Sequence, residues 1–244
     1  MTQAGFNLSG KVALVTGGSK GIGLAVAEAI LEHGGSVAIC ARNGGEVEVV
    51  GRKLEGSYPK RVLAIACDVR HEGDVEGAFR AVDARFGGLD VLINNAGVGF
   101  FKNLEKMTLE EWNSILETNV TGVFLCCRAA IPRMRARGGG YIINMSSLAG
   151  RNAFPQATAY NASKFALNGM SEALMQEVRY DNIRVSYLMP GSVATDFGRG
   201  STNKSGWALQ PADVAAMVVM LATSPDHALY SRVEMRPSRP PRKG

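Results

Sequence analysis

Short apolar runs alternate along the chain with longer stretches in which apolar residues recur at helical spacing. The apolar runs predict buried strands, and the stretches between them predict amphipathic helices. Strand–helix alternation is typical of right-handed βαβ units, with helices on both faces of a parallel sheet. The sequence therefore predicts a single-domain, doubly wound α/β (Rossmann) fold over residues 1–236. Strands are expected at residues 12–16, 36–40, 61–66, 89–94, 141–145, 183–188 and 232–235.

Helical periodicity follows most of these strands. Thr108 and Glu111 have capping-box spacing at the start of one helical region, and Pro211 opens the last helix. Residues 196–210 carry little regular signal, and we expect a short substrate lid there, with a plain surface loop as the alternative. Helices are expected near residues 24–31, 45–54, 72–86, 119–137, 157–180 and 212–222.

Composition narrows the class of protein. The 244 residues are 46% hydrophobic and 20% charged, as in soluble globular proteins. We expect a cytoplasmic protein without a membrane segment, because no signal peptide pattern or run of 18 apolar residues is found. The four cysteines lie in apolar stretches without metal-ligand spacing, which predicts buried thiols and no metal site.

The net charge of +5 belongs mainly to the end of the chain. Arg236, Arg239, Arg242 and Lys243 supply four positive charges, which leaves +1 for residues 1–235. Residues 237–244 form a short basic, proline-rich tail that we expect to be a flexible, solvated end. Nucleic acid is therefore not expected as a partner.

A glycine-rich turn joins the first strand to the first helix. Gly17, Gly21 and Gly23 allow a sharp turn and a close approach of the backbone to a phosphate. The start of the helix adds free N–H groups and the positive end of the helix dipole. The turn predicts a dinucleotide site, although an ordinary glycine-rich connection is the alternative.

The end of the second strand indicates which dinucleotide binds. NAD sites usually carry an acid about 20 residues after the glycine turn, whereas NADP sites need a cation for the 2′-phosphate. This strand ends in Cys40-Ala41-Arg42-Asn43, with no acid, and Lys20 in the turn could reach the same phosphate. The sequence predicts NADP(H) as the cofactor.

Tyr160 and Lys164 lie one helical turn apart, so their side chains share a face. A fixed positive charge nearby favours the phenolate, and we expect Lys164 to lower the pKa of Tyr160 from its usual value near ~10. Ser147 ends a strand thirteen residues earlier, where its hydroxyl could donate to a substrate oxygen or simply serve a turn. Asp68 could bind an adenine amino group or cap a helix.

An ordered set of motifs resembles the short-chain dehydrogenase/reductase family over residues 9–222. The set comprises Thr16-Gly17-x-x-x-Gly21-Ile22-Gly23, Asn94-Asn95-Ala96-Gly97, Asn119, Ser147, Tyr160-x-x-x-Lys164 and Pro190-Gly191. The resemblance implies that Tyr160 is the general acid for carbonyl reduction and that Ser147 holds the substrate oxygen. It also implies that Lys164 binds the nicotinamide ribose and lowers the pKa of Tyr160, and that Asn119 supports a proton relay.

The resemblance also implies a set of cofactor contacts, with Asp68 and Val69 at adenine and Thr195 at the carboxamide. The expected cofactor-binding residues are Gly17, Ser19, Lys20, Gly21, Ile22, Gly23, Arg42, Asp68, Val69, Asn95, Ala96, Gly97, Tyr160, Lys164, Pro190, Gly191, Val193 and Thr195. The expected substrate pocket is apolar, which suits a ketone, aldehyde or acyl chain. Its expected residues are Val98, Leu148, Phe154, Phe197 and Trp207.

Two other functions stay open. A 3-oxoacyl-[acyl-carrier-protein] or 3-oxoacyl-CoA reductase would use the arginines between residues 128 and 137 to dock an acidic carrier, although such charges are usually a solvated face. The second alternative is a regulatory protein that binds NADP but does not catalyse a reaction. The family implies a homodimer or homotetramer, but residues 233–238 depart from the Asp-Gly-Gly ending that often supports tetramers. Pairing through the helices at 119–137 and 157–180 is the simpler expectation.

Overall fold

The computed structural model describes residues 6–197 and 206–240. Within them, the chain forms a seven-stranded sheet in the order β3-β2-β1-β4-β5-β6-β7, and every pairing is parallel. The strand order reverses between β1 and β4, which is where open α/β sheets bind ligands. The predicted fold class is confirmed. The strands are β1 Val12–Thr16, β2 Ser36–Ala41, β3 Val62–Ala66, β4 Val91–Asn94, β5 Gly140–Met145, β6 Ile183–Pro190 and β7 Arg232–Met235.

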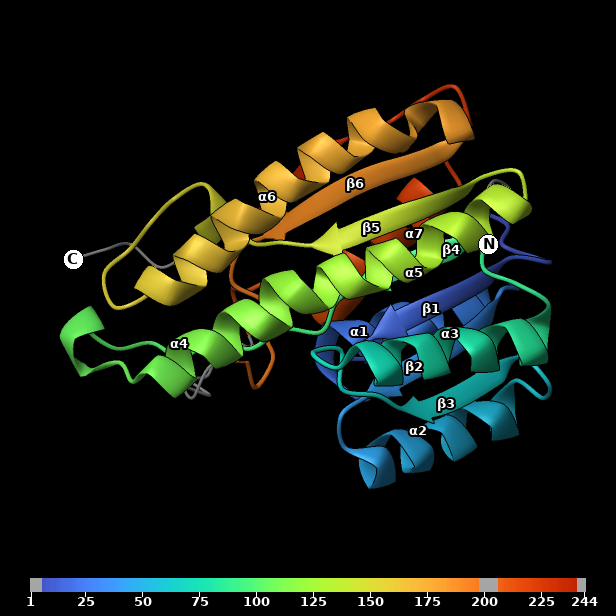
Figure 1. Cartoon of the computed structure of the whole chain (residues 1–244), viewed down its shortest axis with the longest axis horizontal. Helices are drawn as coiled ribbons and strands as arrows, with labels where there is room; N and C mark the ends of the chain where they lie inside the picture. Colours follow the sequence, from blue (N-terminus) through green and yellow to red (C-terminus); the bar gives the residue numbers. More distant parts are fainter. Residues whose placement is uncertain (1–5, 198–205, 241–244) are drawn as a thin grey trace.

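Helices cover both faces of this sheet (Figure 1). α3, α5 and α6 pack on one face, and α1, α2 and α7 pack on the other. The helices are α1 Gly21–Glu32, α2 Gly44–Ser57, α3 Glu72–Phe86, α4 Leu109–Leu116, α5 Gly122–Ala136, α6 Thr158–Val178 and α7 Pro211–Ala222. The capping box predicted at Thr108 and Glu111 is present at the start of α4.

The two cores follow from the period of two along each strand. In β1, Val12 and Leu14 belong to one core, whereas Ala13 and Val15 belong to the other. Both faces of the strand are thus buried, which explains its nearly continuous apolar sequence. The four cysteines are free and buried in the described structure, as predicted.

A π-helical turn at Glu117–Thr121 joins α4 to α5. The resulting helix, Leu109–Ala136, is long and apolar enough to cross a membrane by length and composition alone. However, 56% of its most apolar window is buried inside the protein, as expected for a helix packed on a sheet. The sequence pattern predicts helix here but not the π-helical turn, which contains Asn119.

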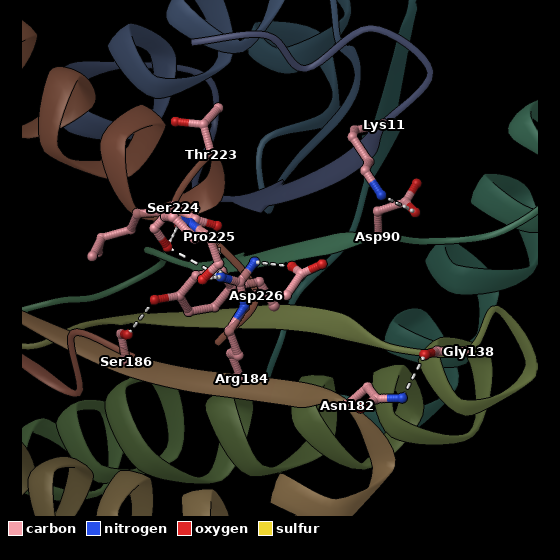
Figure 2. A network of polar contacts seen from close by, with 12 residues as sticks. Lys11, Asp90, Gly138, Asn182, Arg184, Ser186, Thr223, Ser224, Pro225 and Asp226 are labelled. Carbon is pink, nitrogen blue, oxygen red and sulfur yellow. Dashed lines mark hydrogen bonds and ion pairs between the residues drawn. The ribbon is translucent and has the colours of Figure 1, made fainter. Parts of the chain in front are cut away.

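Polar contacts tie the amino-terminal edge of the sheet together (Figure 2). Arg184 of β6 donates to the carbonyl oxygens of Ser224 (2.9 Å) and Pro225 (3.2 Å) after α7, and its guanidinium lies 4.4 Å from the centre of the Tyr141 ring. Asp90 pairs with Lys11 and with Arg137. A cavity of about 600 Å³ lies among these groups. Arg184 thus joins the segment after α7 to β6, whereas Asp90 links the residues that precede β1 and β5.

Candidate active site

The glycine-rich turn has a backbone conformation that residues with side chains would not adopt at its glycine positions. Gly17 and Gly21 have φ of 64° and 56°, in the left-handed region that favours glycine. A Cβ on Gly23 would lie 2.2 Å from the carbonyl oxygen of Gly17. Within the described residues, no side chain caps the start of α1, so its first N–H groups can serve another acceptor. The turn fits a dinucleotide phosphate.

Asn95, directly after β4, stabilises the glycine-rich turn through hydrogen bonds. Its Nδ2 donates to the carbonyl oxygens of Thr16 (2.9 Å) and Gly17 (3.1 Å), and its own N–H donates to Thr16 Oγ1 (3.0 Å). The N–H of Ala96 donates to the same hydroxyl at 3.0 Å. The structure thus shows Asn95 positioning the turn.

Asn119 is fully buried in the π-helical turn. Its Oδ1 accepts from the Val98 N–H, and its Nδ2 donates to the Val98 carbonyl, both at 2.9 Å. Nδ2 also donates to Ser163 Oγ at 3.0 Å. Ser163 precedes Lys164 on α6, so Asn119 links the segment after β4 to the helix that carries Tyr160.

Tyr160, Lys164 and Ser147 meet at the carboxyl edge of the sheet. Lys164 Nζ donates to the Met145 carbonyl oxygen at 2.8 Å and lies 5.7 Å from the centre of the Tyr160 ring. Ser147 shares a hydrogen bond with Tyr160, and its Oγ also accepts from the Ala149 N–H. The structure brings together the four predicted catalytic residues. Sequence alone had no signal for the contacts to Met145 and Ser163, which depend on packing between separate segments.

The predicted lowering of the Tyr160 pKa is wrong for this structure. Burial raises the pKa of Tyr160 to about 12, against a smaller lowering by the Ser147 hydrogen bond. Burial also lowers the pKa of Lys164 to about 8. Desolvation disfavours the charged form of each group, and it is the largest cause of both shifts. Tyr160 therefore keeps its proton at neutral pH, the form that a general acid needs.

The buried amine predicts that stability rises with pH. The folded-state pKa of Lys164 is about 8, below its ordinary value of 10.5. Between these values the unfolded chain binds more protons than the folded one, so the free energy of unfolding should increase. In urea titrations from pH 8 to 10, the wild type should gain up to about 1.4 kcal/mol per pH unit relative to Lys164→Met.

The control for this titration is Lys53→Met, which removes an exposed charge from α2. Its stability curve should run parallel to that of the wild type. Equal slopes for wild type and Lys164→Met would mean that Lys164 does not titrate in this range.

The end of β2 carries no acid, but a carboxylate from the next helix lies near the expected 2′-phosphate subsite. Glu46, in the first turn of α2, accepts from Ser19 Oγ at 3.1 Å and lies 3.9 Å from Lys20 Nζ. Arg42 is exposed directly after β2. The expected subsite thus contains two cations and one carboxylate.

Asp68 is paired with Arg70, and its pKa is held below its usual range by hydrogen bonds from that guanidinium. The alternative that Asp68 caps α3 is wrong, because His71 is the N-cap residue. Val69 is buried against Gly122. Adenine would therefore meet an Asp68 carboxylate that already has a cationic partner.

Aromatic rings surround Tyr160. The ring centres of Phe101 and Phe197 each lie 5.6 Å from that of Tyr160, and Phe154 lies 6.0 Å from Phe101. The three phenylalanines are 39–47% exposed, so they form an open apolar surface around the Tyr160 ring.

The other expected contacts lie on neighbouring segments. Thr195 faces Gly21 at the start of α1, and Leu148 lies beside Gly191 at the end of β6. Val193 pairs with Leu209, and Trp207 is half-buried nearby in sequence. Residues 198–205 of the expected lid and residues 241–244 of the tail lie outside the described residues.

Similarity to known proteins identifies the protein family of this chain. Residues 11–206 match the family model described as short chain dehydrogenase. The chain therefore belongs to the short-chain dehydrogenase/reductase family, whose members are oxidoreductases that bind nicotinamide cofactors. The resemblance seen in the sequence is confirmed at this level.

Particular relatives share most of the chain. The D-threitol dehydrogenase of Mycolicibacterium smegmatis is 38% identical over 229 residues, covering 89% of this chain and 88% of that protein. A metagenomic short-chain oxidoreductase in complex with NADP is 36% identical with a TM-score of 0.83, covering 96% and 99% of the chains. A 3-ketoacyl-(acyl-carrier-protein) reductase from Brucella melitensis complexed with NADH is 31% identical with a TM-score of 0.87, covering 96% and 99%.

Proposed function

We propose that this oxidoreductase uses NADP(H) to interconvert a carbonyl and an alcohol on a largely apolar substrate. The observation that carries the proposal is the buried Tyr160 hydroxyl, bonded to Ser147 and one turn from Lys164, at the sheet edge that also holds the glycine-rich turn. The fold and family make the nicotinamide chemistry the natural partner of this site.

The residues of the chain supply orientation and a proton. A bound nicotinamide cofactor supplies the hydride for reduction and accepts it in the reverse direction. Ser147 and Tyr160 would donate hydrogen bonds to the substrate oxygen, where negative charge develops. Tyr160 would then transfer its phenolic proton to that oxygen. Lys164 would hold the nicotinamide ribose, and Asn119 would keep the helix of Tyr160 in place and support the proton relay.

NADP(H) is favoured over NAD(H) by the two cations at the expected 2′-phosphate subsite. Lys20 is exposed in the turn, and Arg42 is exposed after β2. Arginine binds phosphate with paired, charge-assisted hydrogen bonds. The relative crystallised with NADP supports this choice, whereas the one crystallised with NADH shows that the fold also accepts the other cofactor.

An apolar carbonyl substrate is favoured by the aromatic surface beside Tyr160. Phe101, Phe154 and Phe197 offer ring faces but no charged group for a polar substrate. The arginines expected to dock an acidic carrier do not favour that alternative, because each has an acidic partner within the chain. The pairs are Arg128–Glu72, Arg133–Asp83, Arg135–Asp181 and Arg137–Asp90.

A homodimer is the assembly that the surface favours. Phe124 on α5 and Phe165 on α6 are 46% and 48% exposed. Large apolar side chains on neighbouring helices are typical of surfaces that pair with another copy. The elution volume of the purified protein in size-exclusion chromatography tests this assignment.

An assay of NADPH and NADH oxidation across ketones, aldehydes, quinones, steroids and 3-oxoacyl thioesters tests the function. We expect turnover of apolar carbonyls, with kcat/KM at least about tenfold higher for NADPH, since one charge-assisted hydrogen bond contributes about 1.5–3 kcal/mol. Equal kcat/KM for the two cofactors would contradict the NADP preference. Tight NADPH binding without turnover would instead favour the idle regulatory protein.

A further inference from the structure

Glu46 stands four residues after Arg42, and the fold brings its carboxylate to Ser19 and Lys20 of the glycine-rich turn. Its backbone N–H donates to Asn43 Oδ1, the N-cap of α2, at 3.2 Å. This bond helps to fix the first turn of α2 beside the end of β2. The position also suits a carboxylate, because the start of a helix favours negative charge. Glu46 is therefore held at the mouth of the glycine-rich turn.

The side chain of Glu46 uses the same donors that a 2′-phosphate would need. Glu46 Oε1 accepts from the Ser19 hydroxyl at 3.1 Å and lies 3.9 Å from Lys20 Nζ. The Lys20 side chain is 75% exposed, so its ammonium can turn toward a ligand, whereas Ser19 is buried and already donates its proton. A phosphate bound here would have to displace the carboxylate from Ser19 and share Lys20 with it.

Charge adds to this competition. A phosphate monoester carries nearly two negative charges at neutral pH, and a carboxylate bonded to the same groups repels it. The 2′-hydroxyl of NAD carries no charge and can donate a hydrogen bond to a carboxylate, which is how NAD sites commonly hold it. Glu46 therefore acts against the phosphate but not against the hydroxyl.

We propose that Glu46 is a specificity-determining residue that weakens binding of the 2′-phosphate and keeps the cofactor site open to NAD(H). The inference rests on the proposed function, because it takes the 2′-phosphate subsite to lie at Ser19, Lys20 and Arg42. It limits the preference for NADP(H) that the two cations create.

Isothermal titration calorimetry of NADP⁺ and NAD⁺ binding tests this role without an assay of turnover. Glu46→Gln removes the charge but keeps an oxygen acceptor for Ser19. We expect it to tighten NADP⁺ binding about tenfold relative to NAD⁺, equivalent to about 1.4 kcal/mol. The gain should shrink between 0.05 and 0.5 M salt, because exposed charges are screened. Glu46→Ala, which also frees the Ser19 hydroxyl, should change the ratio in the same direction.

Glu48→Gln is the matched control. Glu48 lies two residues further along α2, where it pairs with Arg52 at 3.1 Å and is 65% exposed. Its substitution should leave the ratio of the two dissociation constants unchanged. If both nucleotides bind but Glu46→Gln and Glu46→Ala keep the wild-type ratio, the role of Glu46 is wrong and the proposed function stands. If the wild type binds neither nucleotide, both are wrong.

Discussion

Tyr160→Phe should lower kcat for NADPH-dependent reduction at least about a hundredfold, since general acid catalysis is typically worth 10²–10⁴-fold. The substitution removes only the hydroxyl that shares a hydrogen bond with Ser147. The ring would keep its contacts with Phe101 and Phe197, so the fold should persist. Steady-state kinetics with the best carbonyl from the substrate screen would measure the loss.

Calorimetry distinguishes this loss from a loss of cofactor binding. The Kd for NADPH should stay within about twofold, because the proposed role of the hydroxyl is toward the substrate oxygen. Tyr180→Phe is the control, since Tyr180 is 91% exposed and distant in sequence from the site; it should behave as wild type. Near-normal turnover of Tyr160→Phe would remove Tyr160 from the role of general acid.

Gly23→Ala should weaken binding of both NADP⁺ and NAD⁺ at least about a hundredfold. A Cβ there would lie 2.2 Å from the Gly17 carbonyl oxygen and 2.5 Å from Asn95 Nδ2, so the backbone of the turn must move. Movement would break the bonds from Asn95 to Thr16 and Gly17 that shape the phosphate site. Overpacking of this kind costs typically about 1–3 kcal/mol of stability. A displaced turn would also lose the backbone N–H contacts to the phosphates.

Urea unfolding and calorimetry would measure the two effects of Gly23→Ala separately. Gly56→Ala is the matched control, because Gly56 lies in α2 with no heavy atom within 4 Å of an added Cβ. It should stabilise the protein by about 0.5–1 kcal/mol, through helix propensity, and leave nucleotide binding unchanged. Wild-type binding by Gly23→Ala would show that the turn does not approach the dinucleotide.

Hydrophobic periodicity and motif spacing predicted the strands and helices, because both depend on residues that are close together in the chain. Buried strands such as β1 need apolar residues on both faces, and the capping box of Thr108 and Glu111 needs only three-residue spacing. Tyr160 and Lys164 fall on one face because a helix has 3.6 residues per turn. The π-helical turn at Glu117–Thr121 could not be predicted in this way, since a single turn of five residues is too short to be recognised from the hydrophobic period.

The sequence by itself determined the order of strands and helices, the glycine-rich turn and the helical pair of Tyr160 and Lys164. Only the tertiary structure decided how those groups behave. Burial raised the pKa of Tyr160, where a lowered pKa was expected. Packing of α6 on the sheet placed the Lys164 amine within hydrogen-bond distance of the Met145 carbonyl oxygen. Packing also brought Glu46 to Ser19, 27 positions away in the chain. Such effects depend on desolvation and on contacts between distant segments, and neither leaves a periodic trace in the sequence.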